Sequence, residues 1–138
     1  MDAKKYLEQY EKIDSIIINK TIEAEKWDEL AKNITSQMGG ERVQSSGSQQ
    51  KMADAINKSV DIKAEVEALV TKKKEITDTI QQLPKMEYDV LHRIYIQSKS
   101  FKEVESETKN TYTWVTTTHG RALQHLQELL ETRNRKRT

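Results

Sequence analysis

Hydroxyl-bearing side chains gather between residues 111 and 117, in the stretch Thr-Tyr-Thr-Trp-Val-Thr-Thr. A threonine hydroxyl can hydrogen-bond to a base edge or a phosphate, and its methyl group can contact the methyl group of thymine. Residues 85–138, which contain this stretch, carry 10 basic and 7 acidic side chains. These residue types suit contact with nucleic acid, but they would equally suit the polar surface of a small helical bundle.

Other candidate chemistry in the sequence is limited. The chain has no cysteine, which excludes disulfides, thiolate metal sites and cysteine nucleophiles. His92, His119 and His125 lack the partners and the spacing of a zinc site, so we expect no metal and no cofactor. Because the sequence has neither a glycine-rich phosphate loop nor a nucleophile motif, we do not expect an enzyme.

The elements around the hydroxyl-rich stretch predict a helix-turn-helix within residues 84–131. After a first helix that ends near Gln97, Ser100 and Glu103 have the spacing of a capping box, which opens a short helix. Residues 109–110 form the turn, and Thr111 caps a final helix from Tyr112 to about Glu131. In this motif the second helix enters the major groove and its first residues face the bases.

The predicted DNA contacts follow from this placement. The expected base-reading positions at the start of the final helix are Tyr112, Thr113, Thr116 and Thr117. The expected contacts to the DNA backbone are Lys99, Lys102, Arg121 and the basic tail 132–138.

Apolar residues at a seven-residue repeat organise the first part of the chain. In residues 4–36 the stripe consists of Tyr6, Tyr10, Ile13, Ile17, Lys20, Ala24, Trp27, Ala31 and Ile34. In residues 49–83 it consists of Met52, Ala55, Ser59, Ile62, Val66, Leu69, Lys73, Ile76, Ile80 and Leu83. The glycines and serines of residues 37–48 predict a loop between two antiparallel helices.

The fold class expected from these patterns is all-α: a long antiparallel helical hairpin, or coiled-coil arm, over 1–83, followed by a small C-terminal helix-turn-helix. Pro84 marks the expected domain boundary. Leu7, Ile16, Ile18 and Leu30 lie outside the main stripe, so we expect the arm to form a homodimer that covers them. The first eight residues have no apolar segment and no stretch is apolar enough for a membrane span, so we expect a cytoplasmic protein.

The stretch from Tyr88 to Leu130, with "LHRIYIQSKSFKEVESETKNTYTWVTTTHGRALQHLQELL", resembles region four of bacterial sigma factors. It is similar to the sigma-like phage and prophage regulators of the ArpU/RinA type. The opening "MDAKKYLEQYEKID" and the segment "GERVQSSGSQQKMADAI" also look like a prophage family of Gram-positive bacteria that carries this domain. The resemblance implies a DNA-binding transcriptional regulator with RNA polymerase as a further partner. It places Thr111 at a cap that contacts phosphate, and Tyr112, Thr113 and Thr116 at base-reading positions.

The sequence departs from the sigma pattern at several positions. That pattern has a small residue where Glu105 stands, an apolar residue at Thr108, and arginines near Tyr112 and Thr116. These departures weaken the expectation of high DNA affinity. Two other functions also stay open at this point. One is a DNA-packaging adaptor like a small terminase subunit, and the other is a helical module that binds only protein.

Overall fold

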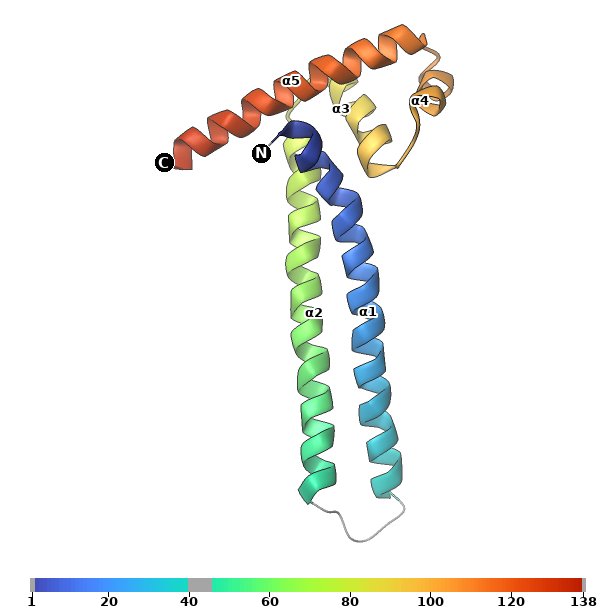
Figure 1. Cartoon of the computed structure of the whole chain (residues 1–138), viewed down its shortest axis with the longest axis vertical. Helices are drawn as coiled ribbons and strands as arrows, with labels where there is room; N and C mark the ends of the chain where they lie inside the picture. The colour runs from blue at the N-terminus through green and yellow to red at the C-terminus, as the bar shows by residue number, and fades with distance from the viewer. Residues whose placement is uncertain (1, 40–45, 138) are drawn as a thin grey trace. The chain divides into compact units, whose positions relative to one another are not determined.

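The computed structural model describes residues 2–39 and 46–137, which are almost entirely helical (Figure 1). The order of elements is α1 (Ala3–Gly39), α2 (Ser46–Ile80), α3 (Lys85–Leu91), the π-helical turn η1 (His92–Ile96), α4 (Phe101–Thr108) and α5 (Tyr112–Arg137). The described residues contain no strand. The expected all-α class, with a long helical hairpin followed by short C-terminal helices, is confirmed.

Several predicted boundaries were wrong. The whole of 37–48 was expected to form a loop, but α1 continues to Gly39 and α2 begins at Ser46; residues 40–45 lie outside the described part. A glycine disfavours a helix by only about 1 kcal/mol relative to alanine, and here the helices continue into the glycine- and serine-rich stretch. At the other end, α5 does not stop near Glu131 but includes the basic residues that were expected to form a tail.

The chain divides into two compact units, and the division does not fall at the expected boundary, Pro84. One unit comprises Met1–Asp14 together with Lys72–Thr138, and the other comprises Ser15–Thr71. The first turns of α1, up to Asp14, and the last turns of α2, from Lys72, therefore belong to the same unit as the C-terminal helices. Hydrogen bonds between residues far apart in sequence explain this: the Ala3 backbone N–H donates to Gln127 Oε1 of α5 at 2.8 Å.

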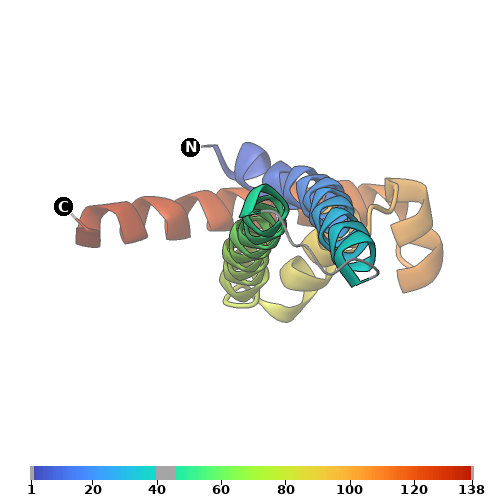
Figure 2. The same ribbon diagram turned by 90° about the horizontal axis from the view of Figure 1, so that it is seen from below.

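Within the unit Ser15–Thr71, α1 and α2 pack as an antiparallel pair. Residue numbers that rise along α1 meet falling numbers along α2, as in the ion pair of Lys20 Nζ with Glu65 Oε2 at 2.5 Å. Further along, Ser59 Oγ donates to Asp28 Oδ1, also at 2.5 Å. Figures 1 and 2 show the two helices side by side from two directions. Among the residues of this unit whose burial is described, the buried ones have small side chains, namely Ala24, Ala31, Ala55 and Ser59.

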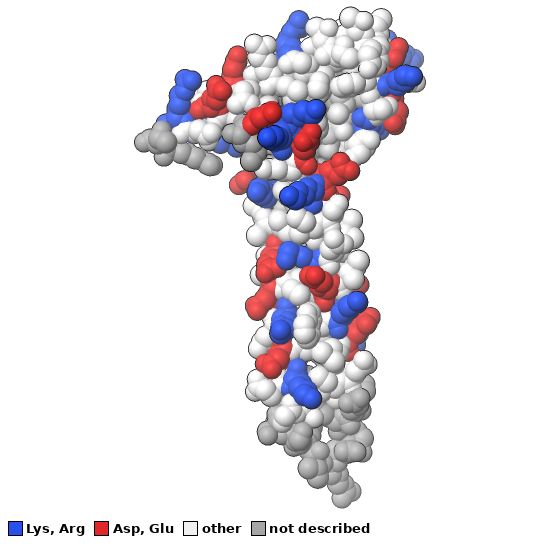
Figure 3. Space-filling view, viewed as in Figure 1, with Lys and Arg blue, Asp and Glu red and all other residues white. Residues whose placement is uncertain are grey.

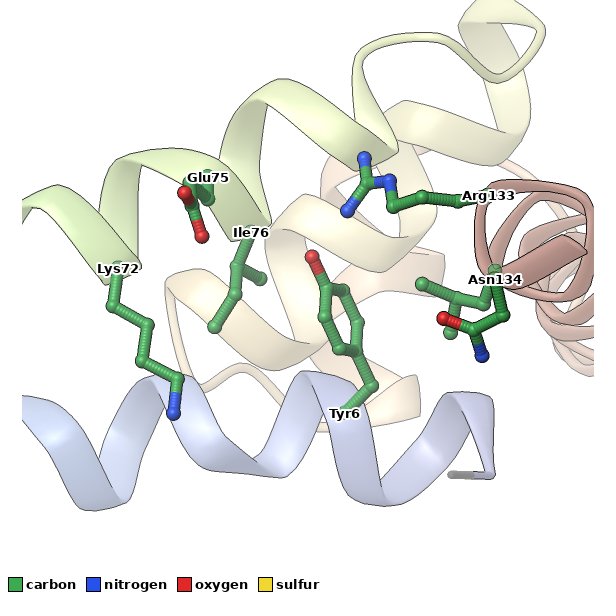
Figure 4. A pocket seen from close by; sticks show the side chains of 7 residues that line it. Tyr6, Lys72, Glu75, Ile76, Arg133 and Asn134 are labelled. Atoms are coloured by element: carbon green, nitrogen blue, oxygen red, sulfur yellow. The ribbon is translucent and has the colours of Figure 1, made fainter. Parts of the chain in front are cut away.

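The Thr79 hydroxyl links three helices in the other unit. It accepts hydrogen bonds from Tyr6 Oη of α1 at 3.1 Å and from Arg133 Nη2 of α5 at 2.9 Å, and it donates to the Glu75 carbonyl at 2.7 Å. One donor and two acceptor sites are the whole capacity of a hydroxyl, so this buried group is fully satisfied. Figure 4 shows Arg133 reaching from α5 toward Tyr6 beside a cavity of ≈ 190 Å³, whose other lining residues include Lys72 and Ile76.

None of the described helices combines the length and the apolar character needed to cross a membrane. Each of the two long helices instead buries a narrow stripe and keeps charged residues along the remaining faces.

The four residues that were expected to need a second chain to cover them differ in their exposure. Leu7 is fully buried and Ile16 is half-buried, whereas Ile18 and Leu30 are exposed. The expectation that Leu7 needs a second chain to cover it was therefore wrong. Its own unit covers it, because the first turns of α1 pack with residues from 72 onward.

This difference gives a matched test of the fold. Leu7→Ala removes a side chain with 0% exposure and should lower the free energy of unfolding by about 2–5 kcal/mol. Leu30→Ala makes the same chemical change on a side chain that is 43% exposed and should cost less than about 1 kcal/mol. Urea denaturation of both variants measures the two values. Equal losses would contradict the assignment of Leu7 to the core.

Candidate nucleic-acid interface

Local hydrogen bonds define where α4 and α5 begin. The capping box is confirmed: the Glu103 backbone N–H donates to Ser100 Oγ at 3.2 Å, and the Ser100 backbone N–H donates to Glu103 Oε1 at 3.3 Å. Lys109 ends α4 in the left-handed region with φ of 58°. Thr111 then caps α5, because its Oγ1 accepts the backbone N–H of Trp114 at 3.1 Å. The turn and both caps lie where the sequence placed them.

Three valines hold the short helices together. Val90 of α3, Val104 of α4 and Val115 of α5 form one cluster with no exposed surface. Ile94, Phe101 and Trp114 are partly buried against this cluster. The β-branched side chains are stiff at χ1, so they fill this small core with few alternative rotamers. The cluster fixes how α4 and α5 cross, and so determines which face of α5 stays open.

Ion pairs add a polar clamp between η1 and α4. Glu107 of α4 accepts hydrogen bonds from Lys99 Nζ at 2.7 and 2.6 Å and also pairs with Arg93 of η1. Arg93 reaches Asp89 one turn earlier at 3.0 Å. The hydrogen bond from Lys99 is the main cause of a lowered pKa at Glu107, and the pairing with Arg93 adds to it. The ammonium group of Lys99, one of the residues expected to contact DNA, is thus bound by Glu107.

A histidine packs inside the same small domain. His119 Nε2 lies 2.8 Å from Tyr95 Oη, and its ring meets Phe101 edge-on at a centroid distance of 5.0 Å. Burial raises the pKa of Tyr95 to about 12, so its hydroxyl keeps the proton that neutral His119 can accept. Burial also lowers the pKa of His119, with a smaller contribution from Lys4. These contacts make His119 a half-buried packing residue of this small domain.

The open face of α5 carries the threonines. Thr111, Tyr112, Thr113 and Thr117 are exposed, and Thr116 is half-buried with its hydroxyl donating to the Thr113 carbonyl at 3.0 Å. Tyr112 leans on Phe101 of α4, edge to face, at 6.1 Å between ring centroids. Lys102 and Arg121 are also exposed. Apart from the basic tail, six of the eight expected contact residues are therefore exposed, and the exceptions are Lys99 and Thr116, which are half-buried.

One surface feature was not predicted from the sequence. Gly120 follows Thr116 by four residues, so both lie on the face of α5 that carries Thr113. A methyl group added at Gly120 would meet nothing within 4 Å. Residues 112–120 contain no charged side chain, so a polar but uncharged strip runs along the first turns of α5. Its signal in the sequence was the unbroken run without Asp, Glu, Lys or Arg.

The departures from the sigma pattern have local explanations. Glu105 is only half-buried, so its carboxylate is not forced into the contact between α4 and α5. Thr108 replaces an apolar residue at the end of α4, and its hydroxyl donates to the Val104 carbonyl at 2.7 Å. Both residues are accommodated without an unsatisfied buried side-chain atom among the described residues.

Charge over the surface is mixed. In the view of Figure 3, basic and acidic side chains alternate across the face, and neither sign forms a continuous field. Among residues 2–39 and 46–137, no group of three or more His, Asp or Glu side chains is placed to hold a metal ion. Whatever binds at the open face of α5 therefore meets mainly hydroxyl groups, flanked by separate cations.

Comparison of the chain with protein-family models, with curated proteins and with solved structures finds no match.

The environment of His119 predicts a pH-dependent stability. Because burial holds the pKa of His119 below its ordinary value of 6.5 in the folded protein, the unfolded chain binds this proton more readily. The free energy of unfolding should therefore fall as the pH drops below 6.5 and stay constant with respect to this group above it. Denaturant melts between pH 7 and pH 5 check this, and His119→Gln should reduce the slope. An NMR titration that finds the His119 pKa at or above 6.5 would contradict the burial argument.

Proposed function

We propose that this chain is a sequence-specific DNA-binding transcriptional regulator that reads duplex DNA with the start of α5. The single observation that carries the proposal is the uncharged hydroxyl face of α5, presented by a capped helix-turn-helix. The implied targets, from the resemblance to sigma-like phage regulators, are phage or prophage genes. RNA polymerase is the second partner that the resemblance implies.

Base recognition is assigned to Tyr112, Thr113, Thr116 and Thr117. A helix that enters the major groove presents its first turns to the base edges, which is where these residues lie in α5. A threonine hydroxyl can donate or accept hydrogen bonds at a base edge, and its methyl group can contact the thymine methyl, so both groups can discriminate between bases. Since Thr116 Oγ1 donates to the Thr113 carbonyl, its lone pairs and methyl group are the parts left for DNA.

Phosphate contacts are assigned to fewer residues than the sequence suggested. Lys102 and Arg121 are exposed and flank the hydroxyl face in the chain, and the Thr111 cap adds a polar group at the helix start. Lys99 is excluded because Glu107 holds its ammonium, and Arg133 is directed to Thr79. With few cations, a large part of the specificity should come from base contacts and DNA shape.

Threonine substitutions test base reading. Thr113→Ala with Thr116→Ala should relax the preferred sequence obtained by selection from a random duplex pool, because each side chain that reads a base well supplies about 1–3 kcal/mol of discrimination. Thr132→Ala is the matched control, since Thr132 is an exposed threonine of the same helix, far from its start. If the double variant selects the same sequence as the wild type, α5 does not read bases and the domain is better described as a protein-binding module.

Lysine and arginine substitutions test the backbone contacts separately. Lys102→Ala and Arg121→Ala should weaken binding to every duplex to a similar degree without changing the selected sequence. Each should also reduce the slope of log affinity against log salt concentration by roughly 0.9, the contribution of one neutralised phosphate. Lys85→Ala removes an exposed lysine outside the proposed surface and should leave the slope unchanged. Fluorescence anisotropy at several salt concentrations measures all three.

A further inference from the structure

A second stripe runs along α2, one position beyond the buried one. It consists of Ile56, Val60, Lys63, Glu67 and Val70, which alternate spacings of four and three. Each member follows a residue of the buried or half-buried stripe directly, so the second stripe is turned by about 100° around the helix. All five residues belong to the unit Ser15–Thr71. A regular repeat of this kind matches the contact surface of a further helix.

The three aliphatic members of the stripe are exposed to an unusual degree. Ile56, Val60 and Val70 have exposed fractions of 45%, 57% and 50%. Beside them lies a groove of ≈ 400 Å³ between the two helices, lined by Thr21, Ala24, Glu25 and Asp28 of α1 and by Lys63, Val66 and Glu67 of α2.

The far edge of this groove is also aliphatic. Ile18 and Ile22 of α1 are exposed, and each precedes a groove-lining residue, Thr21 or Glu25, by three positions. Residues three apart are neighbours on a helix surface, so these isoleucines lie next to the groove. An aliphatic ridge on α2 therefore stands beside an open groove with a second aliphatic edge.

We propose that this face binds a second copy of the chain, with the two α2 helices antiparallel about a twofold axis. The order of residues in the stripe is self-complementary in that arrangement. When Lys63 of one copy lies opposite Glu67 of the other, Val60 lies opposite Val70, and the twofold axis repeats both contacts. The groove-lining residues Lys63 and Glu67 of the two copies then face each other. The assignment rests on unit Ser15–Thr71 alone and stands apart from DNA binding.

The charges of Lys63 and Glu67 favour the antiparallel arrangement over a parallel one. Parallel α2 helices in register would place Lys63 on Lys63 and Glu67 on Glu67, which is repulsive at both positions. Lys63 remains available for the antiparallel pairing, because its side chain is 60% exposed even though Nζ contacts Asp28 Oδ2 at 3.1 Å. An ammonium group has three donors and can hold both carboxylates.

Charge reversal and mixing test the proposal. Sedimentation velocity of the full chain should show a dimer, and Lys63→Glu or Glu67→Lys should each weaken it at least about tenfold, because both symmetric pairs become repulsive. An equimolar mixture of the two single variants should form a heterodimer, since every opposed pair is again of opposite sign. The variant that carries both substitutions should recover the homodimer for the same reason.

Matched controls use the same charge changes elsewhere in this unit. Lys26→Glu on α1 and Asp61→Lys on α2 alter exposed residues outside the stripe and should leave the dimer intact. Circular dichroism establishes that each single variant retains its helix content. A wild-type chain that is monomeric from micromolar to millimolar concentration overturns the proposal and leaves the face to a different partner. So does a mixture of single variants that associates no better than either variant alone.

Discussion

The packing of Val90, Val104 and Val115 is the constraint on which the C-terminal helices depend. Each valine comes from a different helix, and none of the three has exposed surface. Because α3, α4 and η1 span only a few residues each, they cannot be stable helices in isolation and need this shared contact. Fixing α4 against α5 also fixes the direction of the threonine face. The candidate interface is therefore a consequence of core packing.

Polar interactions then decide which charged groups remain for binding. Glu107 holds Lys99 and pairs with Arg93, and the Thr79 hydroxyl accepts a hydrogen bond from Arg133. Because of these contacts, fewer cations are available to bind phosphate groups. What remains near the start of α5 is mostly uncharged, so recognition there would depend more on shape and hydroxyl geometry than on electrostatic attraction.

The two long helices pack against each other with few large apolar residues between them. Between Ser15 and Thr71 the buried positions are small, and charged pairs such as Lys20 with Glu65 lie at the margins. Small buried side chains permit close packing but contribute little apolar area, which weakens the pair on its own. The exposed aliphatic residues of α2 and α1, such as Val60 and Ile18, are apolar surface that this pair leaves uncovered. DNA binding and self-association are thus assigned to different residues in different units.

The sequence by itself determined the features that arise from local spacing. The seven-residue repeats predicted the two long helices and their antiparallel pairing, and Ser100, Glu103 and Thr111 marked the helix ends, because capping bonds join residues two or three positions apart. Only the tertiary structure decided the burial of Leu7, the engagement of Lys99 and Arg133, and the continuation of α5 through the basic residues. The longer of these contacts join residues far apart in the chain, such as Thr79 with Arg133. Whether a side chain can bind a partner depends on which distant residue packs against it. The spacing of residues along one helix does not identify that neighbour.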